Sequence, residues 1–341
     1  DETNRVIFKP GLATSLNNLS SIFSSQGQKE KALNLAWEAV AIRKQLAESN
    51  PQIFLPDLAA SLYNLGFRLS ELIQRNEALD VVQKAVNIYK QLVISNPQAF
   101  LPLLAASLNN LGGRLYDLCK WDDALAAAQD SVNIFRKLSV SNPHSFLPEL
   151  AMSLNNLGKT FSSMKRRDKA LSAVQESVDI YRMLAKTNPQ AFLPELAKYL
   201  NNMSLGLYNL GLRREALAAI EEAVVIRRRL TVSDPQTYRS DLATSLQNQG
   251  LILSGMGQSL EALDAANEAV EIFSQLAEVN PKTFLPDLAK SLGAYGRILL
   301  SLERHADAAS AFAEGLQILA PFYRKLPQAF AGLANALRQG Y

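Results

Sequence analysis

Two adjacent asparagines recur along the chain inside a pattern that is otherwise helical. Residues 107–112 read SLNNLG, and variants of this stretch return every 46 residues. A carboxamide side chain has one acceptor oxygen and an NH2 group that can donate twice, so it can pair with both groups of a peptide bond. Asparagine is a weak helix former because its amide competes for local backbone groups. Its repetition therefore indicates a role in binding a ligand or in holding helices together.

The second asparagine of the pair is the more regular one. It forms a column with one member in each of six consecutive repeats: Asn18, Asn64, Asn110, Asn156, Asn202 and Asn248. On a helix that turns about 100° per residue, this position points well away from the leucine stripe and lies on the outward face. We expect the column to contact an extended peptide. The alternative is an amide ladder that joins neighbouring helices side by side.

The rest of this outward face differs between repeats, which is where binding specificity would arise. The members expected to contact a ligand are aromatic or basic: Tyr63, Phe67, Tyr116, Lys159, Lys198 and Tyr208. The early part of the face is aromatic and acidic, and the later part is apolar and basic. A partner with a basic part, an apolar middle and an acidic part or free carboxylate would match it. For any single charged residue, simple solvation is the alternative.

The sequence contains no arrangement of residues typical of an active site. His144 and His305 are far apart, and neither has a Cys, Asp or Glu at metal-ligand spacing. Cys119 is the only cysteine, so no internal disulfide can form. It also has no nearby histidine that could activate it as a nucleophile. Glycine-rich motifs that bind phosphate do not occur. We therefore predict that the protein is not an enzyme and needs no metal or cofactor.

The composition is that of a folded protein. Of 341 residues, 48% are hydrophobic and 20% are charged, with a formal net charge of +3. This near balance gives no reason to expect a nucleic-acid partner. Neither a signal peptide nor an apolar run long enough to cross a membrane occurs, so we expect a cytoplasmic protein with no membrane partner.

The elements that position these residues form a tandem repeat. An aromatic residue opens each repeat at intervals of 46 residues: Phe8, Phe54, Phe100, Phe146, Phe192, Tyr238, Phe284 and Phe330. This period predicts seven two-helix repeats that start near residues 8, 54, 100, 146, 192, 238 and 284. A partial capping helix is expected over 330–341, so that residues 1–341 form a single domain.

Each repeat is predicted to contain a helix A and a helix B. In the second repeat, Pro56 suits the first turn of helix A, where the N–H that proline lacks would have no partner. Leucines at spacing 4, 3, 4, 3 between residues 58 and 72 form the buried stripe. Helix B is expected from about Glu77 to Leu92. The preceding Phe-Leu-Pro segment, residues 54–56, is expected to be an apolar plug between repeats.

The pattern of large and small residues indicates the class of repeat. In the second repeat its members are Leu62, Leu65, Gly66 and Leu69, followed by Ala78, Val82 and Ala85. This pattern resembles the tetratricopeptide signature in register, although the tetratricopeptide unit has about 34 residues. The chain is similar to long-repeat, kinesin-light-chain-like arrays. The resemblance implies an α-solenoid that forms a superhelix, with helices A on the concave side.

The same resemblance implies a scaffold that binds a protein or peptide segment on its concave face. Similar arrays in multidomain bacterial and fungal proteins accompany signalling NTPase or caspase-like protease domains. One alternative is therefore a regulatory or sensor array that docks its own neighbouring domain, and another is end-to-end self-association through uncapped end repeats. A basic run at residues 227–229 is expected to be solubilising, with an acidic partner as the alternative.

Overall fold

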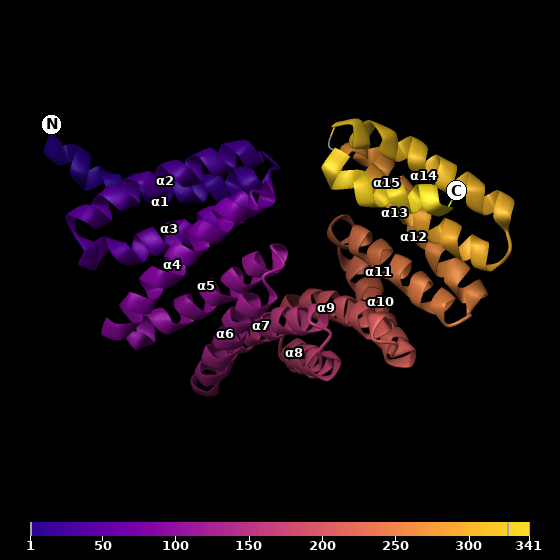
Figure 1. The fold of residues 1–341 in the computed structure, drawn as a ribbon, viewed down its shortest axis with the longest axis horizontal. Helices are drawn as coiled ribbons and strands as arrows, with labels where there is room; N and C mark the ends of the chain where they lie inside the picture. The colour runs from indigo at the N-terminus through magenta and orange to yellow at the C-terminus, as the bar shows by residue number, and fades with distance from the viewer. Residues whose placement is uncertain (1, 326, 341) are drawn as a thin grey trace. The chain divides into compact units, whose positions relative to one another are not determined.

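The computed structural model describes residues 2–325 and 327–340, and every secondary-structure element in these ranges is an α-helix (Figure 1). The chain divides into two compact units, residues 1–177 and 178–341, which we call the first and the second unit. The expected all-α fold of helix pairs in tandem is confirmed. None of the helices in the described ranges combines the length and the apolarity that a bilayer span needs.

In the first unit, the helices pack in chain order. They are α1 (Glu2–Ser25), α2 (Lys29–Ser49), α3 (Pro51–Glu71), α4 (Arg75–Ser95), α5 (Pro97–Asp117), α6 (Trp121–Ser141), α7 (Pro143–Ser163) and the first half of α8 (Arg167–Thr187). Odd-numbered helices are the A helices of successive repeats, and even-numbered helices are the B helices. From α1 to α7 each helix packs against the next, and α1 also contacts α3, as α5 contacts α7. Neighbouring A helices therefore adjoin.

The second unit repeats this arrangement. It contains the rest of α8, then α9 (Pro189–Asn209), α10 (Arg213–Ser233), α11 (Pro235–Gly255), α12 (Ser259–Val279), α13 (Pro281–Ser301), α14 (His305–Lys325) and α15 (Pro327–Gly340). The A helices α9, α11, α13 and α15 contact one another in sequence. On α15, Ala334 and Leu337 are 4% and 1% exposed, because they pack into a core shared with α13 and α14.

Helix A begins earlier than was predicted from the sequence. α3 begins at Pro51 with Asn50 as its N-cap, and Pro56 lies inside the helix. In α5, the side chain of the N-cap Asn96 accepts a hydrogen bond from Ala99 N across 3.1 Å. Placing Pro56 in the first turn was wrong, because Asn50 occupies the N-cap position of α3, without a side-chain capping bond, and Pro51 is the first helical residue. The Phe-Leu-Pro segment is thus part of helix A, and the equivalent Phe100 packs against the core, as expected for an apolar contact between repeats.

Successive repeats are connected by a single non-helical residue. α2 ends at Ser49 and α3 begins at Pro51, so that only Asn50 separates them, with φ −146° and ψ 85°. The equivalent residues have φ between −138° and −146°: Asn96, Asn142, Asn188, Asp234 and Asn280. A residue before proline is kept out of the helical region by a clash with the proline ring. The sequence therefore dictates this break at each of the six joints whose residue the structure describes.

Within a repeat, a three-residue turn joins helix A to helix B. In the second repeat, Ile73 has a left-handed φ of 61°, and Cys119 holds this position in the third repeat with a φ of 57°. Glycine, which adopts this conformation without strain, takes the position in three repeats: Gly27, Gly211 and Gly257. Helix B then begins at Arg75, two residues before the predicted start at Glu77.

Small residues allow the two helices of a repeat to approach closely, as predicted. Gly66 on α3 faces α4, where a Cβ atom would overlap with the side chain of Val82. Ala78 on α4 has no exposed surface. In the first repeat Ser20 takes the place of this glycine, and its Oγ donates a hydrogen bond to Ala32 O across 2.7 Å. A larger side chain here would separate the two helices.

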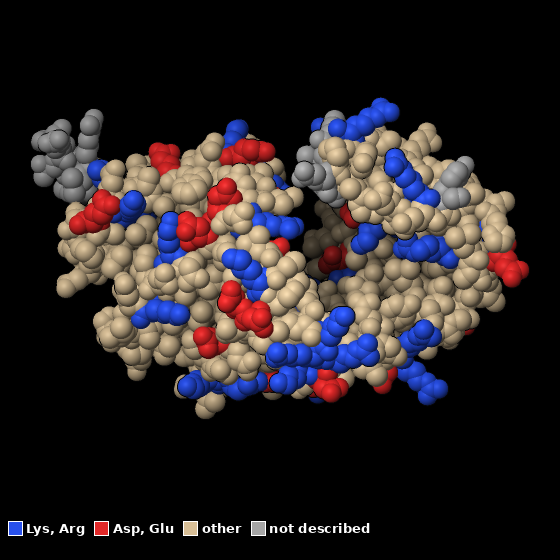
Figure 2. All heavy atoms as spheres, viewed as in Figure 1, with Lys and Arg blue, Asp and Glu red and all other residues tan. Residues whose placement is uncertain are grey.

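Charged residues on the B helices pair between successive repeats. Arg136 on α6 lies 2.6 Å from Glu176 on α8 in the first unit, and Arg228 on α10 lies 2.5 Å from Glu268 on α12 in the second. Figure 2 shows both signs of charge interspersed over the visible face of the first unit. Arg227 is only 5% exposed. The expectation of a solubilising run at 227–229 was therefore wrong for Arg227, which is buried, whereas the side chain of Arg228 is 51% exposed.

Candidate functional site

The asparagine column lies on the A helices of both units. Its members are Asn18 on α1, Asn64 on α3, Asn110 on α5, Asn156 on α7, Asn202 on α9 and Asn248 on α11. Within the column Asn18 is exposed, Asn110 and Asn248 are each 7% exposed, and the other three are half-buried. Neighbouring A helices thus cover part of a face that the helical pattern alone assigns to solvent.

Two members of the column bond to the neighbouring A helix. Asn156 Nδ2 donates to Asn109 Oδ1 across 3.0 Å, and Asn248 Nδ2 donates to Asn201 Oδ1 across 3.0 Å. Ser245 Oγ also donates to Asn201 Oδ1, across 3.1 Å. The amide ladder that was the alternative to ligand contact therefore exists at these positions. Each donating amide retains a second N–H, so that ladder bonding and ligand contact are compatible.

The ladder is incomplete in the described residues. Asn17 Oδ1, which by this spacing would accept from Asn64, is buried without a partner, and a second position without a rung is Asn110. By the same spacing its acceptor would be residue 63, and that residue is Tyr63 instead of asparagine. Asn110 Nδ2 is buried and has no hydrogen-bond partner among the described residues. A buried donor without a partner costs about 1–3 kcal/mol. This unpaired amide lies in the wall of a pocket.

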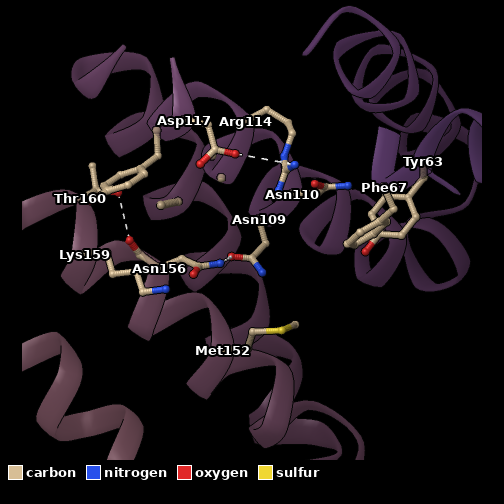
Figure 3. A pocket seen from close by; sticks show the side chains of 14 residues that line it. Tyr63, Phe67, Asn109, Asn110, Arg114, Asp117, Met152, Asn156, Lys159 and Thr160 are labelled. Carbon is tan, nitrogen blue, oxygen red and sulfur yellow. Dashed lines mark hydrogen bonds and ion pairs between the residues drawn. The ribbon is translucent and has the colours of Figure 1, made fainter. Parts of the chain in front are cut away.

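The pocket lies in the first unit among α3, α5 and α7 and has a volume of about 300 Å³ (Figure 3). We call it the Gly113 pocket, after a residue on α5 that lines it. Six of the residues predicted from the sequence line it: Tyr63, Phe67, Asn110, Tyr116, Asn156 and Lys159. The structure thus brings half of the predicted contact residues into one place.

Gly113 leaves the pocket open. A Cβ atom built on this residue would meet no other atom within 4 Å. The equivalent positions in other repeats carry side chains: Phe67, Lys159, Leu205, Leu251 and Arg297. Gly113 was not selected from the sequence, although the pair Gly112-Gly113 was a signal, because no other repeat has two adjacent glycines at this point. The next residue, Arg114, also lines the pocket and was not predicted from the sequence to contact a ligand.

Apolar side chains form the walls of the pocket. Tyr63 and Phe67 on α3 make an edge-to-face contact, with ring centroids 5.1 Å apart. Phe67 is 40% exposed, and Met152 on α7 is 39% exposed. On α5, the ring of Tyr116 packs edge-to-face against Trp121, also at 5.1 Å. The pocket therefore offers accessible apolar surface from two A helices.

The polar groups of the pocket are mainly donors. Arg114 Nη1 donates to Ser70 Oγ and lies 3.7 Å from Asp117 Oδ2. Arg114 Nε is buried and has no partner among the described residues. Burial raises the pKa of Tyr63, and the nearby charge of Arg114 offsets part of that rise. Asn110 Nδ2 and Arg114 Nε are thus two buried N–H donors without a partner on residues that line the pocket, and each could be satisfied by an acceptor oxygen that reaches it.

The other six predicted contact residues do not line this pocket: Asn18, Asn64, Lys198, Asn202, Tyr208 and Asn248. In the second unit, Lys198 Nζ lies 3.0 Å from Glu195 Oε2 and over the ring of Tyr199. Burial lowers the pKa of Lys198, but the hydrogen bond and charge of Glu195 outweigh it and leave that pKa raised. Tyr208 packs over Gly255 of α11, where a side chain would collide with the tyrosine ring.

The structure also bears on metal binding. Across the described part of the chain, no group of three or more His, Cys, Asp and Glu side chains could hold a metal ion. His144 near the start of α7 and His305 at the start of α14 are both exposed.

Comparisons with known proteins identify the repeat. One family model described as tetratricopeptide repeat matches residues 103–183, and a second with the same description matches residues 12–52, 58–93 and 196–235. Together these matches cover more than half of the chain. A search of curated protein sequences found no match.

Several solved structures share the fold. BtubC (BKLC) from P. vanneervenii is 18% identical, with a TM-score of 0.59 over 73% of this chain and 92% of that chain. A putative kinesin light chain with nearly identical TPR-like repeats from Podosopora anserina is 18% identical, with a TM-score of 0.50 over 65% of this chain and 97% of that chain. The Rap conjugation gene regulator of the plasmid pLS20, in complex with the Phr* peptide, is 19% identical, with a TM-score of 0.52 over 90% of this chain and 74% of that chain. The chain therefore belongs to the tetratricopeptide repeat family, in a 46-residue form similar to kinesin-light-chain-like arrays.

Proposed function

We propose that this protein is a non-enzymatic interaction scaffold that binds an extended peptide or protein segment on the face formed by its A helices. The observation that carries the proposal is the Gly113 pocket, which combines accessible apolar walls with buried donors that lack partners. Such a combination of apolar surface and a few convergent polar groups is typical of binding sites.

The fold supports the same proposal. A tetratricopeptide array is typically a scaffold without catalytic activity, and such a fold fits a protein-interaction role. One structure of similar fold was solved with a bound peptide. A peptide that lies along adjacent A helices would meet side chains that differ from repeat to repeat, which is the basis of sequence selectivity.

Three further expectations stay predictions. They are a cytoplasmic location, the lack of a nucleic-acid partner, and self-association through the end repeats. Light scattering at several protein concentrations tests the last of these. A mass that rises with concentration supports association, and a constant monomer mass removes it.

Selection from a library of random peptides displayed on phage tests the proposed function. With the full chain immobilised, we expect enriched sequences whose synthetic copies bind the protein in solution. Hydrogen exchange then locates the contact, and we expect protection of amides on α3, α5 and α7. The proposal would be overturned if no peptide is enriched, or if the protected amides lie only on B helices.

A further inference from the structure

We propose that the Gly113 pocket is a subsite that takes a main-chain carbonyl of a bound peptide together with the large apolar side chain beside it. The inference rests on the proposed function and adds the chemistry of the ligand. It follows from two features that coincide on α5: a buried column amide nitrogen without a partner, at Asn110, and a missing side chain, at Gly113.

The unpaired amide nitrogen of Asn110 indicates the polar group that a ligand should carry. In the other observed rungs, the column amide donates to an asparagine one repeat earlier, as Asn156 does to Asn109. Asn110 has no such acceptor, because the residue at that place is Tyr63. Its Nδ2 is therefore a buried donor without a partner, on a side chain only 7% exposed. An incoming acceptor oxygen would remove this cost, whereas a donor group would not.

The second unpaired donor indicates which acceptor fits. Arg114 Nε lies in the same pocket, but the guanidinium is already 3.7 Å from the Asp117 carboxylate. Its charge is thus partly balanced within the protein, and a neutral carbonyl meets the remaining demand without adding a second carboxylate near Asp117. A free carboxylate at the end of a peptide is the competing acceptor, and a peptide with an amidated C-terminus distinguishes the two.

The missing side chain defines the apolar part of the ligand. Gly113 leaves open the space that Leu205 and Leu251 fill at the same position of later repeats. Phe67 and Met152 border this space and are 40% and 39% exposed. A large apolar or aromatic side chain placed there would cover both. Burial of an aromatic side chain removes about 150–250 Å² from water and is a common source of affinity.

The geometry also indicates how the two parts of the ligand are coupled. Figure 3 shows the amide nitrogen of Asn110 directed towards Tyr63 and Phe67. Phe67 is 40% exposed, and the proposal requires that its ring rotate to let the carbonyl reach this nitrogen. The carbonyl and the apolar side chain of one residue, or of two neighbouring residues, would then occupy Asn110 and the space above Gly113 together.

The test uses peptides selected from a random phage-displayed library on the wild-type chain, synthesised with a fluorescent label. Fluorescence anisotropy compares wild type with Gly113→Leu, which fills the pocket. Gly206→Leu is the matched control, since a Cβ atom at Gly206 also meets nothing within 4 Å, and Gly206 lies on α9 of the second unit and does not line the pocket. We expect the dissociation constant to rise about tenfold or more for Gly113→Leu and to stay unchanged for Gly206→Leu.

Two further arms test the chemistry. Asn110→Leu is expected to weaken binding about fivefold, the loss of one hydrogen bond, without lowering the melting temperature. The same peptide with an amidated C-terminus is expected to bind as well as the free acid. A strict need for the free acid would overturn the carbonyl assignment. Equal binding by wild type and Gly113→Leu would place the peptide elsewhere and overturn the subsite while leaving the proposed function intact, whereas failure of all peptides to enrich would overturn both.

Discussion

Asn156 on α7 donates a hydrogen bond from Nδ2 to Asn109 Oδ1 on α5 across 3.0 Å. The two residues are 47 positions apart, one repeat and one residue, and the same separation joins Asn248 to Asn201. The adjacent asparagines therefore work as a pair across two repeats, with one as donor and the other as acceptor. Their contribution to stability can be measured separately from any contact with a ligand.

Replacing Asn156 with leucine removes the donor to Asn109. We expect the free energy of unfolding to fall by about 1–3 kcal/mol, because a buried acceptor loses its partner. Asn110→Leu is the matched control one repeat earlier, and it should cost nothing or stabilise, since Asn110 Nδ2 has no partner among the described residues. Urea unfolding followed by circular dichroism compares the two. Equal losses in both variants would show that the ladder bond does not stabilise the array.

The period of the repeat, and with it the pairing of helices, could be predicted from the sequence because buried small and large residues recur without a gap. The start of helix A could not be placed, because Pro51 and Pro56 each suit a first turn and only one of them has that role. The deciding feature is the residue before each proline. Asn96 caps α5 by accepting from Ala99 N, and an asparagine–proline pair is a signal for this arrangement.

Gly250 on α11 is expected to tolerate no side chain. A Cβ atom there would lie 3.0 Å from Ala262 O and 3.3 Å from Ile298 Cδ1, so Gly250→Ala should lower the free energy of unfolding by about 1–3 kcal/mol. Gly206→Ala on α9 is the control, because its Cβ atom would meet nothing within 4 Å. There alanine should stabilise by about 0.5–1 kcal/mol through its helix propensity. A loss at Gly206 as large as that at Gly250 would contradict the close approach of α11 and α12.

Arg227 is expected to be a structural residue. Its Nη1 atom donates to Asp241 O across 2.5 Å and to Ser245 Oγ across 2.6 Å, and burial lowers the pKa of its guanidinium. Arg227→Ala should lower the free energy of unfolding by about 2–3 kcal/mol, since it leaves a cavity and removes the hydrogen bonds to Asp241 O and Ser245 Oγ. Arg227→Phe should recover most of this loss, because Phe135 and Phe273 fill the equivalent position of other repeats. Thermal unfolding compares the melting temperatures of the two variants with that of wild type. An alanine variant with the melting temperature of wild type would contradict a structural role for Arg227.

Glu149 on α7 is expected to make stability depend on pH. Burial raises the pKa of its carboxyl group, and Oε2 has no partner among the described residues. Because the folded-state pKa is raised, the folded protein holds the proton more tightly, and this group's contribution to stability falls as pH rises through that pKa. Glu149→Gln should therefore raise the melting temperature at pH 7, and the gain should vanish at acidic pH where the wild-type carboxyl is protonated.

The equivalent Glu195 on α9 supplies the control for this measurement. Its Oε2 lies 3.0 Å from Lys198 Nζ, so Glu195→Gln removes an ion pair and should lower the melting temperature slightly. Melting curves of both variants between pH 4 and pH 8 separate the two effects. A Glu149→Gln variant that melts below wild type at neutral pH would show that the charged carboxylate is stabilising.

The candidate site was harder to predict than the fold. A helical pattern assigns Asn110 to an outward face, but it does not tell whether the next A helix covers that face. The distance between α3, α5 and α7 decides this, and it depends on side chains from three repeats at once. The feature that opens the pocket is Gly113, a residue without a side chain, and patterns of residue type draw attention to the side chains that are present.

The single-residue connection between repeats accounts for the constancy of the period. Only Asn50 separates α2 from α3, and the proline after it leaves this joint little freedom to adjust. One added residue would extend a helix and turn everything after it by about 100°, which would direct the leucine stripe away from its core. We therefore expect an insertion at such a joint to be tolerated only when it adds a complete repeat of 46 residues. A single added residue there is expected to lower the free energy of unfolding of the repeats on both sides.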